Sequence, residues 1–407
     1  MPQCRFCAAE LTDVFADLGM SPLANSYLTP EQGNAMEPFY PLRALVCARC
    51  FLVQLEAFET PEHIFGDYAY FSSYSSSWLE HSRRYVEAMT ERFGLGADSK
   101  VVEIASNDGY LLQFFQERDV PVLGVEPAAN VAEVAREKGI PTEVEFFGVD
   151  TARGLVDEHA ADLLLGNNVL AHVPDLNDFV GGMKVLLKPD GVITMEFPHL
   201  MRLVDELQWD TIYHEHFSYF SFLTVRRVFE AHGLRLFDVE ELPTHGGSLR
   251  IFGCHADASR EETDRARELV ERERAAGYED LSTYTAYHER VAQDKREILA
   301  FLLDLKAQGK SIVGYGAPAK GNTMLNFCGV RTDFLDYTVD LNPHKQDHLL
   351  PGTHIPIRSP DALKETRPDV VLVLPWNLRE EIVRDHAYIA EWGGRFAARS
   401  PELRLLS

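Results

Sequence analysis

The run Thr211–Ser221 concentrates side chains that can exchange protons. Tyr213, Glu215 and His216 lie within four positions, and His214 adds a second imidazole. Because the ordinary pKa values of these groups run from about 4 to about 10, one pocket could hold both a proton acceptor and a proton donor near neutral pH. The pattern predicts chemistry that moves a proton on or off carbon. Two alternatives stay open: surface histidines on an amphipathic strand or turn, and a metal site in which two histidines bracket a glutamate.

Four of the six cysteines form two Cys-x-x-Cys pairs, Cys4 with Cys7 and Cys47 with Cys50. Zinc takes four soft ligands in a tetrahedron, and each pair presents two thiolates at about the right separation. A catalytic redox pair is the alternative, but both pairs lie outside the α/β segments and occur together. The sequence therefore predicts a structural zinc ion, because four protein ligands leave no open position for catalysis.

Apolar strand-like segments alternate with helical segments in two parts of the chain. Those in the first part are 101–104, 122–126, 162–168 and 191–197. Those in the second part are 310–316, 334–340 and 369–374. Continuous apolar strands between helices are typical of parallel sheets covered on both faces. We expect an α/β protein whose three parts are a small N-terminal module (1–70), a central Rossmann-like domain with connecting helices (71–305) and a smaller C-terminal Rossmann-like α/β domain (306–407).

The first strand of the central part ends in a pattern that resembles the first motif of class I S-adenosylmethionine methyltransferases. Glu103 supplies the acid, and the Ser-Asn-Asp-Gly loop 106–109 keeps one of the glycines usual in that motif. Glu126 ends the next strand, where a carboxylate can accept both ribose hydroxyl protons. The resemblance places the methionine part of the cofactor at the end of a later strand, 162–168. A bare Rossmann turn and a nicotinamide site are the alternatives, although GxGxxG is absent.

These strand ends define the expected cofactor site, since the carboxyl ends of parallel strands form one crevice. The serine-rich run 72–77, which suits a cap or a ligand-binding loop, adds a tyrosine to it. The predicted S-adenosylmethionine contacts are Tyr74, Glu103, Asn107, Gly109, Glu126, Asn167 and Asn168.

Taken together, five ordered motifs are similar to those of nucleotide-sugar C-methyltransferases, which methylate a ring carbon of a keto-deoxysugar. The resemblance covers essentially the whole chain. Its elements are the two cysteine pairs, Ser106–Gly109, Tyr213–His216, His245–Arg250 and Gly314–Asn322. Members of the family combine an N-terminal zinc-binding module, a central S-adenosylmethionine domain and a C-terminal α/β domain, so the resemblance implies the same arrangement here.

The family chemistry assigns roles to the acid–base cluster. A base removes the acidic proton next to the sugar ketone, and the resulting enolate carbon attacks the sulfonium methyl in line. By resemblance, His216 is the base, with Tyr213 as the alternative. Glu215 would position the sugar, tune His216 or carry the proton onward. His172 would hydrogen-bond to the enolate oxygen; a helix cap or a core histidine is the other interpretation of that residue.

The C-terminal part would bind the nucleotide of the sugar substrate. Gly314-x-Gly316-x-x-x-x-Gly321 follows a strand and opens a helix, a position that favours phosphate oxygens. A former nicotinamide site with Asp340 as the ribose acid is the alternative, and a plain hairpin turn is the alternative for 245–248. The predicted substrate contacts are His245, Gly247, Ser248, Lys320 and Asn322.

The charge and hydropathy of the sequence argue against two classes of binding partner, nucleic acids and membranes. The net charge of −24 over 407 residues argues against nucleic acid, which requires a basic surface. No N-terminal signal pattern and no run of 18 apolar residues occurs, so we expect a cytoplasmic protein without a membrane partner, and a monomer. A nicotinamide-dependent nucleotide-sugar enzyme and a non-catalytic zinc protein that binds a nucleotide or S-adenosylmethionine remain the alternative functions.

Overall fold

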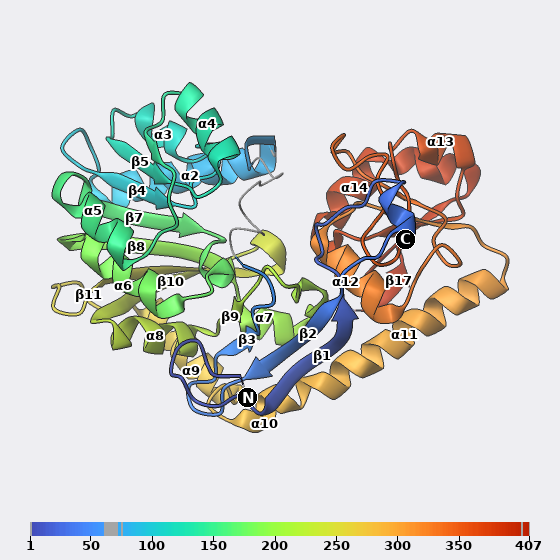
Figure 1. The fold of residues 1–407 in the computed structure, drawn as a ribbon, viewed down its shortest axis with the longest axis horizontal. Helices are drawn as coiled ribbons and strands as arrows, with labels where there is room; N and C mark the ends of the chain where they lie inside the picture. The colour runs from blue at the N-terminus through green and yellow to red at the C-terminus, as the bar shows by residue number, and fades with distance from the viewer. Residues whose placement is uncertain (1, 61–71, 75, 400–401, 407) are drawn as a thin grey trace. The chain divides into compact units, whose positions relative to one another are not determined.

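The computed structural model describes residues 2–60, 72–74, 76–399 and 402–406, and its helices and strands are labelled in Figure 1. The chain divides into two compact units, each assembled from three separate segments. The first unit contains Met1–Leu11, Cys47–Leu200 and Phe217–Glu279. The second unit contains Thr12–Val46, Met201–His216 and Asp280–Ser407.

A seven-stranded sheet forms the centre of the first unit (Figure 1). The strand order is β10-β11-β8-β7-β4-β5-β6, with β4 to β8 parallel and β10 and β11 antiparallel. All residues of β4 and β5 are buried, as expected for central strands covered on both faces. The predicted parallel α/β fold of this part is confirmed. The bounds are β4 (Val101–Ile104), β5 (Val122–Val125), β6 (Thr142–Glu143), β7 (Ala161–Asn167), β8 (Leu187–Pro198), β10 (Leu234–Leu242) and β11 (Ser248–His255).

Helices cover this sheet, and several begin at a side-chain cap. Asp175 accepts a hydrogen bond from the amide of Asp178, and Ser221 accepts one from the amide of Thr224, which satisfies otherwise unpaired amides at a helix start. The helices are α2 (Ser76–Phe93), α3 (Leu112–Gln116), α4 (Ala129–Glu137), α5 (Val149–His159), α6 (Leu176–Leu186), α8 (Phe222–Ala231) and α9 (Asp264–Ala275). Short 3-10 turns are η2 (Ser72–Tyr74), η3 (Leu170–His172) and η5 (Thr244–Gly246).

The cysteine-bearing segments of the first unit flank a two-stranded antiparallel ladder of β3 (Val53–Leu55) and β9 (Ser218–Tyr219). The two cysteine turns have the same backbone form. The amide of Ala8 donates to the carbonyl of Cys4, and the amide of Phe51 donates to the carbonyl of Cys47. Ala8 and Phe51 both have a positive φ, 57° and 63°. The sequence therefore builds two equivalent turns that each present a pair of sulfurs.

The second unit contains a six-stranded sheet of order β14-β13-β12-β15-β16-β17, parallel except for the last strand. The predicted second α/β sheet is thus confirmed. Its strands are β12 (Ile312–Tyr315), β13 (Thr338–Val339), β14 (Ile357–Arg358), β15 (Val370–Val373), β16 (Arg395–Arg399) and β17 (Leu403–Leu405). Its helices are α12 (Ala319–Cys328), α13 (Ala362–Thr366), α14 (Arg379–Asp385), η6 (Trp376–Leu378) and η7 (Ala387–Trp392).

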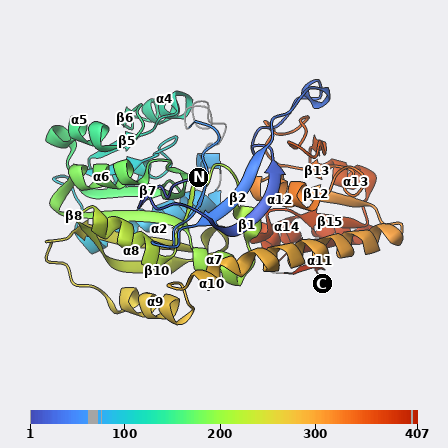
Figure 2. The ribbon, with the colours of Figure 1, turned by 60° about the horizontal axis from the view of Figure 1, so that its bottom comes forward.

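The long helix α11 (Tyr287–Ala307) lies along this sheet and contacts α12 and β17 (Figure 2). It also packs on β1 (Asp13–Ser21), where Phe15 stacks on Tyr287 with ring centroids 4.5 Å apart. β1 pairs with β2 (Tyr40–Val46) in antiparallel fashion. The N-terminal pair is therefore part of the second unit. Further helices are η1 (Gln32–Asn34), η4 (Trp209–Thr211), α10 (Leu281–Thr285) and α7 (Leu200–Asp205), which begins at the last residue of a first-unit segment.

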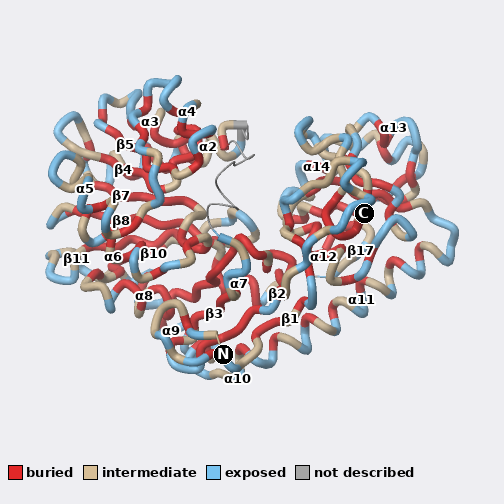
Figure 3. Tube along the Cα trace, in the orientation of Figure 1, coloured by how far each residue is buried: buried red, intermediate tan, exposed pale blue. Residues whose placement is uncertain are grey.

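Each unit has its own core. The strands of both sheets are mostly buried, whereas outer turns of the helices are exposed (Figure 3). In the first unit α2 and α3 pack on β4 through Tyr85, Leu112 and Phe115, and in the second unit Ile389 and Leu363 pack against β12 and β15. Among the helices that the structure describes, none combines the length and apolar character needed to cross a membrane.

Candidate active site

The loop after β4 occupies the carboxyl edge of the first sheet. Glu103 is fully buried, and burial raises the pKa of its carboxyl well above the ordinary value, with Glu126 and Asp108 adding to the rise. Gly109 has φ +75°, and a Cβ there would lie 2.3 Å from Cδ1 of Ile140. Only glycine therefore fits this turn.

Glu126 joins the two neighbouring strand ends. Its Oε2 accepts from the amide of Asn107 and its Oε1 from the amide of Ala128, both at 2.9 Å. Burial raises the pKa of Glu126, while the two amide donors oppose that rise. Since a carboxylate offers about four acceptor positions, each oxygen keeps room for one more donor. The arrangement suits a carboxylate that receives two hydroxyl groups.

The serine run approaches the same loop. The amide of Ser72 donates to Oδ1 of Asn107 at 2.9 Å, and the hydroxyl of Ser73 donates to the carboxylate of Asp108. Tyr74 ends η2 in this run, but its side chain lies outside the described residues. Its predicted contact with the cofactor stays a prediction.

The ends of β7 and of the β10–β11 hairpin lie next to each other. Asn168, with φ 55°, places its Nδ2 3.1 Å from Nε2 of His245. Asn167 is buried at the end of β7, and His172 is partly exposed in η3. His245 is exposed and packs edge-on against the indole of Trp78, with centroids 5.6 Å apart.

The loop 243–247 connects the antiparallel strands β10 and β11, so it is a hairpin connection. Gly247 has φ +115°, and the buried hydroxyl of Ser248 donates to the carbonyl of Thr244 at 3.0 Å. These two residues shape the loop that carries His245. Their predicted contact with substrate is not tested by this geometry.

A buried ion network at this edge was not anticipated from the sequence. Glu196 lies in β8, with Oε2 3.0 Å from Nε2 of His81 and Oε1 2.5 Å from a guanidinium nitrogen of Arg250. Burial alone would raise the pKa of Glu196, but the hydrogen bond from His81 and the charge of Arg250 lower it. Two signals could have indicated the network: a carboxylate inside an apolar strand, and a Trp78–His81 pair spaced i, i+3 on one helix face.

The acid–base cluster lies in the second unit. The hydroxyl of Tyr213 is 2.8 Å from Nε2 of His216, and Nδ1 of His216 is 3.1 Å from the carbonyl of Thr211. Because a carbonyl only accepts, Nδ1 carries the hydrogen, and in the neutral ring Nε2 is the acceptor. Tyr213 is partly exposed, whereas His216 is buried. The structure thus brings the two predicted proton-transfer groups together.

The remaining members of the run point to other parts of the second unit. Oε1 of Glu215 accepts from Nδ2 of Asn25 at 2.7 Å. Burial raises the pKa of Glu215 to about 7, although Asn25 and the charge of Lys345 favour its ionised form. His214 lies 3.3 Å from the carbonyl of Pro41, and burial lowers its pKa.

Immediately before the run, buried charges fix the segment in place. Arg399 contacts Asp210 at 3.0 Å and Asp294 at 2.7 Å. The indole nitrogen of Trp376 donates to Asp210 at 2.7 Å, and that of Trp209 donates to Asp294 at 2.6 Å. Removing one partner of a buried ion pair leaves an uncompensated charge, so this network holds the turn that leads into Tyr213 rigidly.

The glycine loop after β12 is shaped by close packing. A Cβ on Gly316, which has φ +87°, would lie 2.6 Å from Cδ of Pro375, and one on Gly321 would lie 2.8 Å from Cβ of Leu374. The amide of Ala317 donates to Oδ2 of Asp340 at 2.7 Å, so this carboxylate anchors the loop.

Two predicted substrate residues follow the loop in α12. Nζ of Lys320 donates to Oδ1 of Asn377 at 2.8 Å and lies 4.5 Å from the ring centroid of Trp376. Burial lowers the pKa of Lys320 to about 8. Asn322 is fully buried, and neither polar atom of its amide has a hydrogen-bond partner among the described residues. A buried amide without partners is costly.

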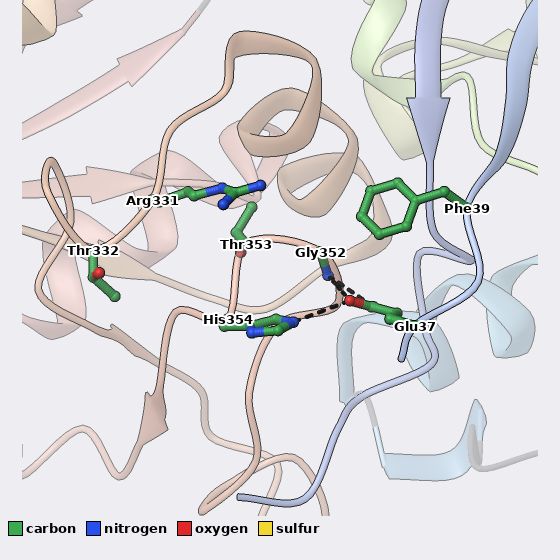
Figure 4. A pocket seen from close by; sticks show the side chains of 7 residues that line it. All are labelled: Glu37, Phe39, Arg331, Thr332, Gly352, Thr353 and His354. Atoms are coloured by element: carbon green, nitrogen blue, oxygen red, sulfur yellow. Dashed lines mark hydrogen bonds and ion pairs between the residues drawn. The ribbon is translucent and has the colours of Figure 1, made fainter. Parts of the chain in front are cut away.

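A separate pocket of about 420 Å³ in the second unit contains none of the predicted site residues. Figure 4 shows Glu37 directed at Gly352 and His354; its carboxylate accepts from the Gly352 amide at 2.8 Å and lies 3.1 Å from Nε2 of His354. These contacts tie a loop to the N-terminal segment. The lining residues are Glu37, Phe39, Arg331, Thr332, Gly352, Thr353 and His354.

The four paired cysteines meet in the first unit. Their sulfurs all lie within 4.8 Å of one another, with Cys4–Cys50 and Cys7–Cys47 distances of 3.5 Å. A zinc tetrahedron with Zn–S bonds of about 2.3 Å has edges of roughly 3.8 Å, so the four sulfurs fit a zinc ion. Nε2 of Gln54 donates to the sulfur of Cys4 at 3.2 Å, and such a hydrogen bond would orient and stabilise a thiolate bound to a metal.

The turn around Cys4 is tied by hydrogen bonds to the start of α6 in the same unit. Arg5 donates to the carbonyl of Pro174 at 2.7 Å and lies over the ring of Phe217. Nδ2 of Asn177 donates to the carbonyls of Arg5 and Phe6 at 3.2 and 3.0 Å. The turn around Cys4 therefore supports the segment that follows His172.

Comparison with known protein families gives three matches along the chain. A zinc binding domain matches residues 4–65, a methyltransferase domain matches residues 78–239, and a C-methyltransferase C-terminal domain matches residues 243–401.

The chain is also similar to individual methyltransferases. C-methyltransferase NovU of Streptomyces niveus is 36% identical over 406 residues, which cover 100% of this chain and 97% of that protein. A ubiquinone biosynthesis O-methyltransferase of Salmonella paratyphi A is 28% identical over 111 residues, 26% of this chain and 45% of that protein.

Among solved structures, an S-adenosylmethionine-dependent methyltransferase from Clostridium acetobutylicum has a TM-score of 0.35 and 9% identity, covering 44% of this chain and 92% of that one. The 1,6-didemethyltoxoflavin-N1-methyltransferase of Burkholderia thailandensis has a TM-score of 0.35 and 16% identity, covering 51% and 95%.

Proposed function

We propose, from the premise that this chain belongs to the family of S-adenosylmethionine-dependent C-methyltransferases with a zinc-binding domain, that its acceptor is a ring carbon next to the ketone of a nucleotide-linked keto-deoxysugar. The observation that carries the proposal is the hydrogen bond between Tyr213 and His216, with Nε2 of His216 as acceptor. A carbon acceptor needs such a base, because C–H is a far weaker acid than the protonated groups that O- and N-methylation use.

The proposed reaction has two steps. First, the C–H bond beside the ketone breaks, its proton passes to the Tyr213–His216 pair and its electron pair forms an enolate. Second, the enolate carbon attacks the methyl group of the sulfonium, so that a C–C bond forms, the S–CH₃ bond breaks and the ketone is restored. The sulfur becomes a neutral thioether and leaves as S-adenosylhomocysteine.

His216 is the proposed proton acceptor of the pair. Its Nδ1 is committed to the Thr211 carbonyl, which orients the ring and leaves Nε2 to receive the proton. Tyr213 is the more exposed member, so it could take the proton from carbon while passing its own to Nε2. In both routes the imidazole of His216 ends protonated. The routes differ in whether His216 or Tyr213 takes the proton directly from the carbon.

The other predicted catalytic residues have supporting roles in this proposal. Glu215, buried and with its pKa raised to about 7, can hold a sugar hydroxyl or pass a proton onward near neutral pH. His172, partly exposed at the end of η3, would donate a hydrogen bond to the enolate oxygen, where negative charge develops.

The cofactor would be held by the first unit. Glu126 keeps one acceptor position on each carboxylate oxygen for the ribose hydroxyls, and the loop 105–109 is held close to it by the Asn107 amide. Asn167 ends β7 and Asn168 follows it at the same carboxyl edge, and both would contact the methionine part.

The nucleotide would be held by the residues that carry positive charge or free polar groups near the glycine loop of the second unit. Lys320 supplies a cation, and Asn322 supplies a buried amide without a partner among the described residues. His245, Gly247 and Ser248 would contact the sugar or pyrophosphate from the hairpin loop. The nicotinamide site with Asp340 as the ribose acid stays the alternative, because Asp340 accepts one amide on each carboxylate oxygen, from Ala317 and Asn342, as Glu126 does.

The proposal includes a cytoplasmic, monomeric enzyme whose domains are divided at about residues 70 and 305, with no nucleic acid or membrane partner.

The test of the proposed function is incubation with methyl-labelled S-adenosylmethionine and a panel of nucleotide-linked keto-sugars. We expect label on carbon of at least one keto-sugar, seen as a new C-methyl signal by NMR. Label only on oxygen, or on none of the panel with cofactor bound, would contradict the assignment.

A further inference from the structure

Asn25 covers the buried carboxyl of Glu215, although 190 positions separate the two residues in the sequence. Glu215 is 7% exposed, whereas Asn25 lies on the surface of the second unit. Nδ2 of Asn25 donates to Oε1 of Glu215 at 2.7 Å. The buried carboxyl of the residue that precedes His216 in the sequence thus accepts a hydrogen bond from an exposed amide.

The turn that carries Asn25 is itself fastened to the glycine loop. The amide of Ser26 donates to the carbonyl of Leu23 at 3.2 Å, which closes the turn. The hydroxyl of Tyr27 lies 2.6 Å from the carbonyl of Ala317 and 3.2 Å from Oδ1 of Asn25. Both partners are carbonyl oxygens that only accept, so they compete for the single hydroxyl hydrogen of Tyr27, and the shorter contact is the one with Ala317.

The amide of asparagine can serve either state of the neighbouring carboxyl. With Nδ2 toward Glu215 it donates to a carboxylate. Rotated by 180°, it places Oδ1 to accept the hydrogen of a carboxylic acid, while Nδ2 donates to the oxygen of Tyr27. The two ends of the amide have nearly the same size, so the exchange needs no movement of the backbone.

We propose that Asn25 is a positioning residue that holds Glu215 in one place both as a carboxylate and as a carboxylic acid. The inference rests on the proposed proton chemistry, in which Glu215 gains and loses a proton. Asn25 touches Glu215 and acts through it. Tyr27 acts one step further away, by fixing the turn to Ala317.

Other charged groups near Glu215 also influence its pKa, so a test of Asn25 must leave their charges unchanged. Lys345 favours the ionised form, and its Nζ donates to the carbonyl of Ala317 at 3.0 Å while lying over the ring of Tyr27. Asp340 lies 3.9 Å from Lys345. Variants at Asn25 leave both of these charges in place, so a change in the titration of Glu215 can be attributed to the amide.

The direct test is the titration of Glu215 by infrared difference spectroscopy on the full chain. The Glu215→Gln variant identifies the carboxyl band by removing it. In wild type we expect this band to titrate near pH 7. Asn25→Leu removes the amide while keeping the number and branching of the side-chain heavy atoms. Because a hydrogen bond to a charged carboxylate is stronger than one to a neutral carboxylic acid, the midpoint should rise by about one pH unit.

Two further variants make the result decisive. Asn25→Asp has the shape of asparagine but repels a second carboxylate, so it should also raise the midpoint, and it serves if Asn25→Leu does not fold. Ser26→Ala, an exposed neighbour in the same turn, should leave the midpoint unchanged. An unchanged midpoint in folded Asn25→Leu or Asn25→Asp would overturn the inference.

A kinetic readout separates this inference from the proposed function. The pH profile of hydrogen exchange at the sugar carbon should move upward in Asn25→Leu by the same amount as the infrared midpoint. If the midpoint moves but no keto-sugar exchanges in wild type, the proposed function fails and the role of Asn25 stands. If wild type exchanges and the profile and midpoint of Asn25→Leu match it, the role of Asn25 fails alone.

Discussion

In each unit, a carboxylate at the end of one parallel strand accepts an amide hydrogen from the loop that follows the neighbouring strand. Glu126, after β5, accepts from Asn107 in the loop after β4. Asp340, after β13, accepts from Ala317 in the loop after β12. The two loops also share a glycine with positive φ, Gly109 and Gly316, so the same local architecture recurs in sheets of different topology.

The charges placed around these loops differ. Around the first loop the buried groups are the carboxyl groups of Glu103 and Glu126, whose pKa values are raised by burial. Near the second loop lie two lysines: Lys345 contacts the Ala317 carbonyl, and Lys320 packs on Trp376. We infer that the architecture provides a ligand-binding edge in each unit and that the polar groups placed there select the ligand. The first loop offers acceptors for hydroxyl groups, and the lysines near the second loop favour phosphate.

Loss of zinc gives the largest expected effect, and it should act on the first unit alone. Structural zinc sites contribute an apparent free energy of about 10–16 kcal/mol to local folding. Cys4→Ser should therefore lose the metal, release the Arg5 and Phe6 contacts with Pro174 and Asn177, and increase hydrogen exchange in those segments. Metal analysis and hydrogen-exchange mass spectrometry check this.

The matched control for the zinc prediction is Cys254→Ala, a buried cysteine of β11 outside the cluster. It should retain one zinc ion per chain. Full zinc content in Cys4→Ser, or hydrogen exchange that rises equally in both units, would show that the cluster does not support the first unit specifically.

Removal of the Glu126 carboxylate should weaken cofactor binding without affecting the nucleotide. Glu126→Ala deletes the proposed ribose acceptor and leaves the amides of Asn107 and Ala128 without their partner. We expect the affinity for S-adenosylhomocysteine to fall by on the order of 1.5–3 kcal/mol, measured by calorimetry. Glu133→Ala, exposed on α4, is the control and should bind S-adenosylhomocysteine normally. An unchanged affinity in Glu126→Ala would contradict the proposed cofactor site at this edge of the sheet.

The converse variant is Lys320→Met, which should weaken binding of a nucleoside diphosphate by about tenfold and leave S-adenosylhomocysteine binding unchanged. Lys364→Met, an exposed charge on α13, should have little effect. If Lys320→Met and Lys364→Met bind the nucleoside diphosphate equally well, the comparison of charges between the two loops is wrong.

The smallest expected effect is the pH dependence of that affinity. Burial lowers the pKa of Lys320 to about 8, so the free protein loses this charge as pH rises through 8. A bound phosphate favours the protonated lysine and raises its pKa. Affinity for the nucleoside diphosphate should therefore fall between about pH 7 and 9 in wild type but stay flat in Lys320→Met, as calorimetry across that range would reveal.

Short-range sequence patterns predicted most of the fold and part of the site. The two Cys-x-x-Cys turns, the apolar strands and the acid Glu126 are encoded within a few residues, because turn geometry and strand burial depend on local sequence. The structure confirms the zinc-type cluster and both α/β sheets, and the family matches confirm the resemblance.

The missed contacts depend on positions that are distant in the sequence. Asn25 meets Glu215 across 190 positions, and His81 meets Glu196 across 115. Neither asparagine nor histidine carries a spacing signal that identifies such a partner. The contact of the turn around Asn25 with the acid–base run could therefore be found only in the folded chain.

The most direct measurement of the central claim is exchange of solvent deuterium into the keto-sugar, with S-adenosylhomocysteine bound so that methyl transfer cannot occur. Wild type should wash deuterium into the carbon beside the ketone. His216→Asn should slow the exchange by about 100- to 10,000-fold while binding both ligands normally. Exchange at the wild-type rate in both His216→Asn and Tyr213→Phe would contradict the claim that this pair takes the proton.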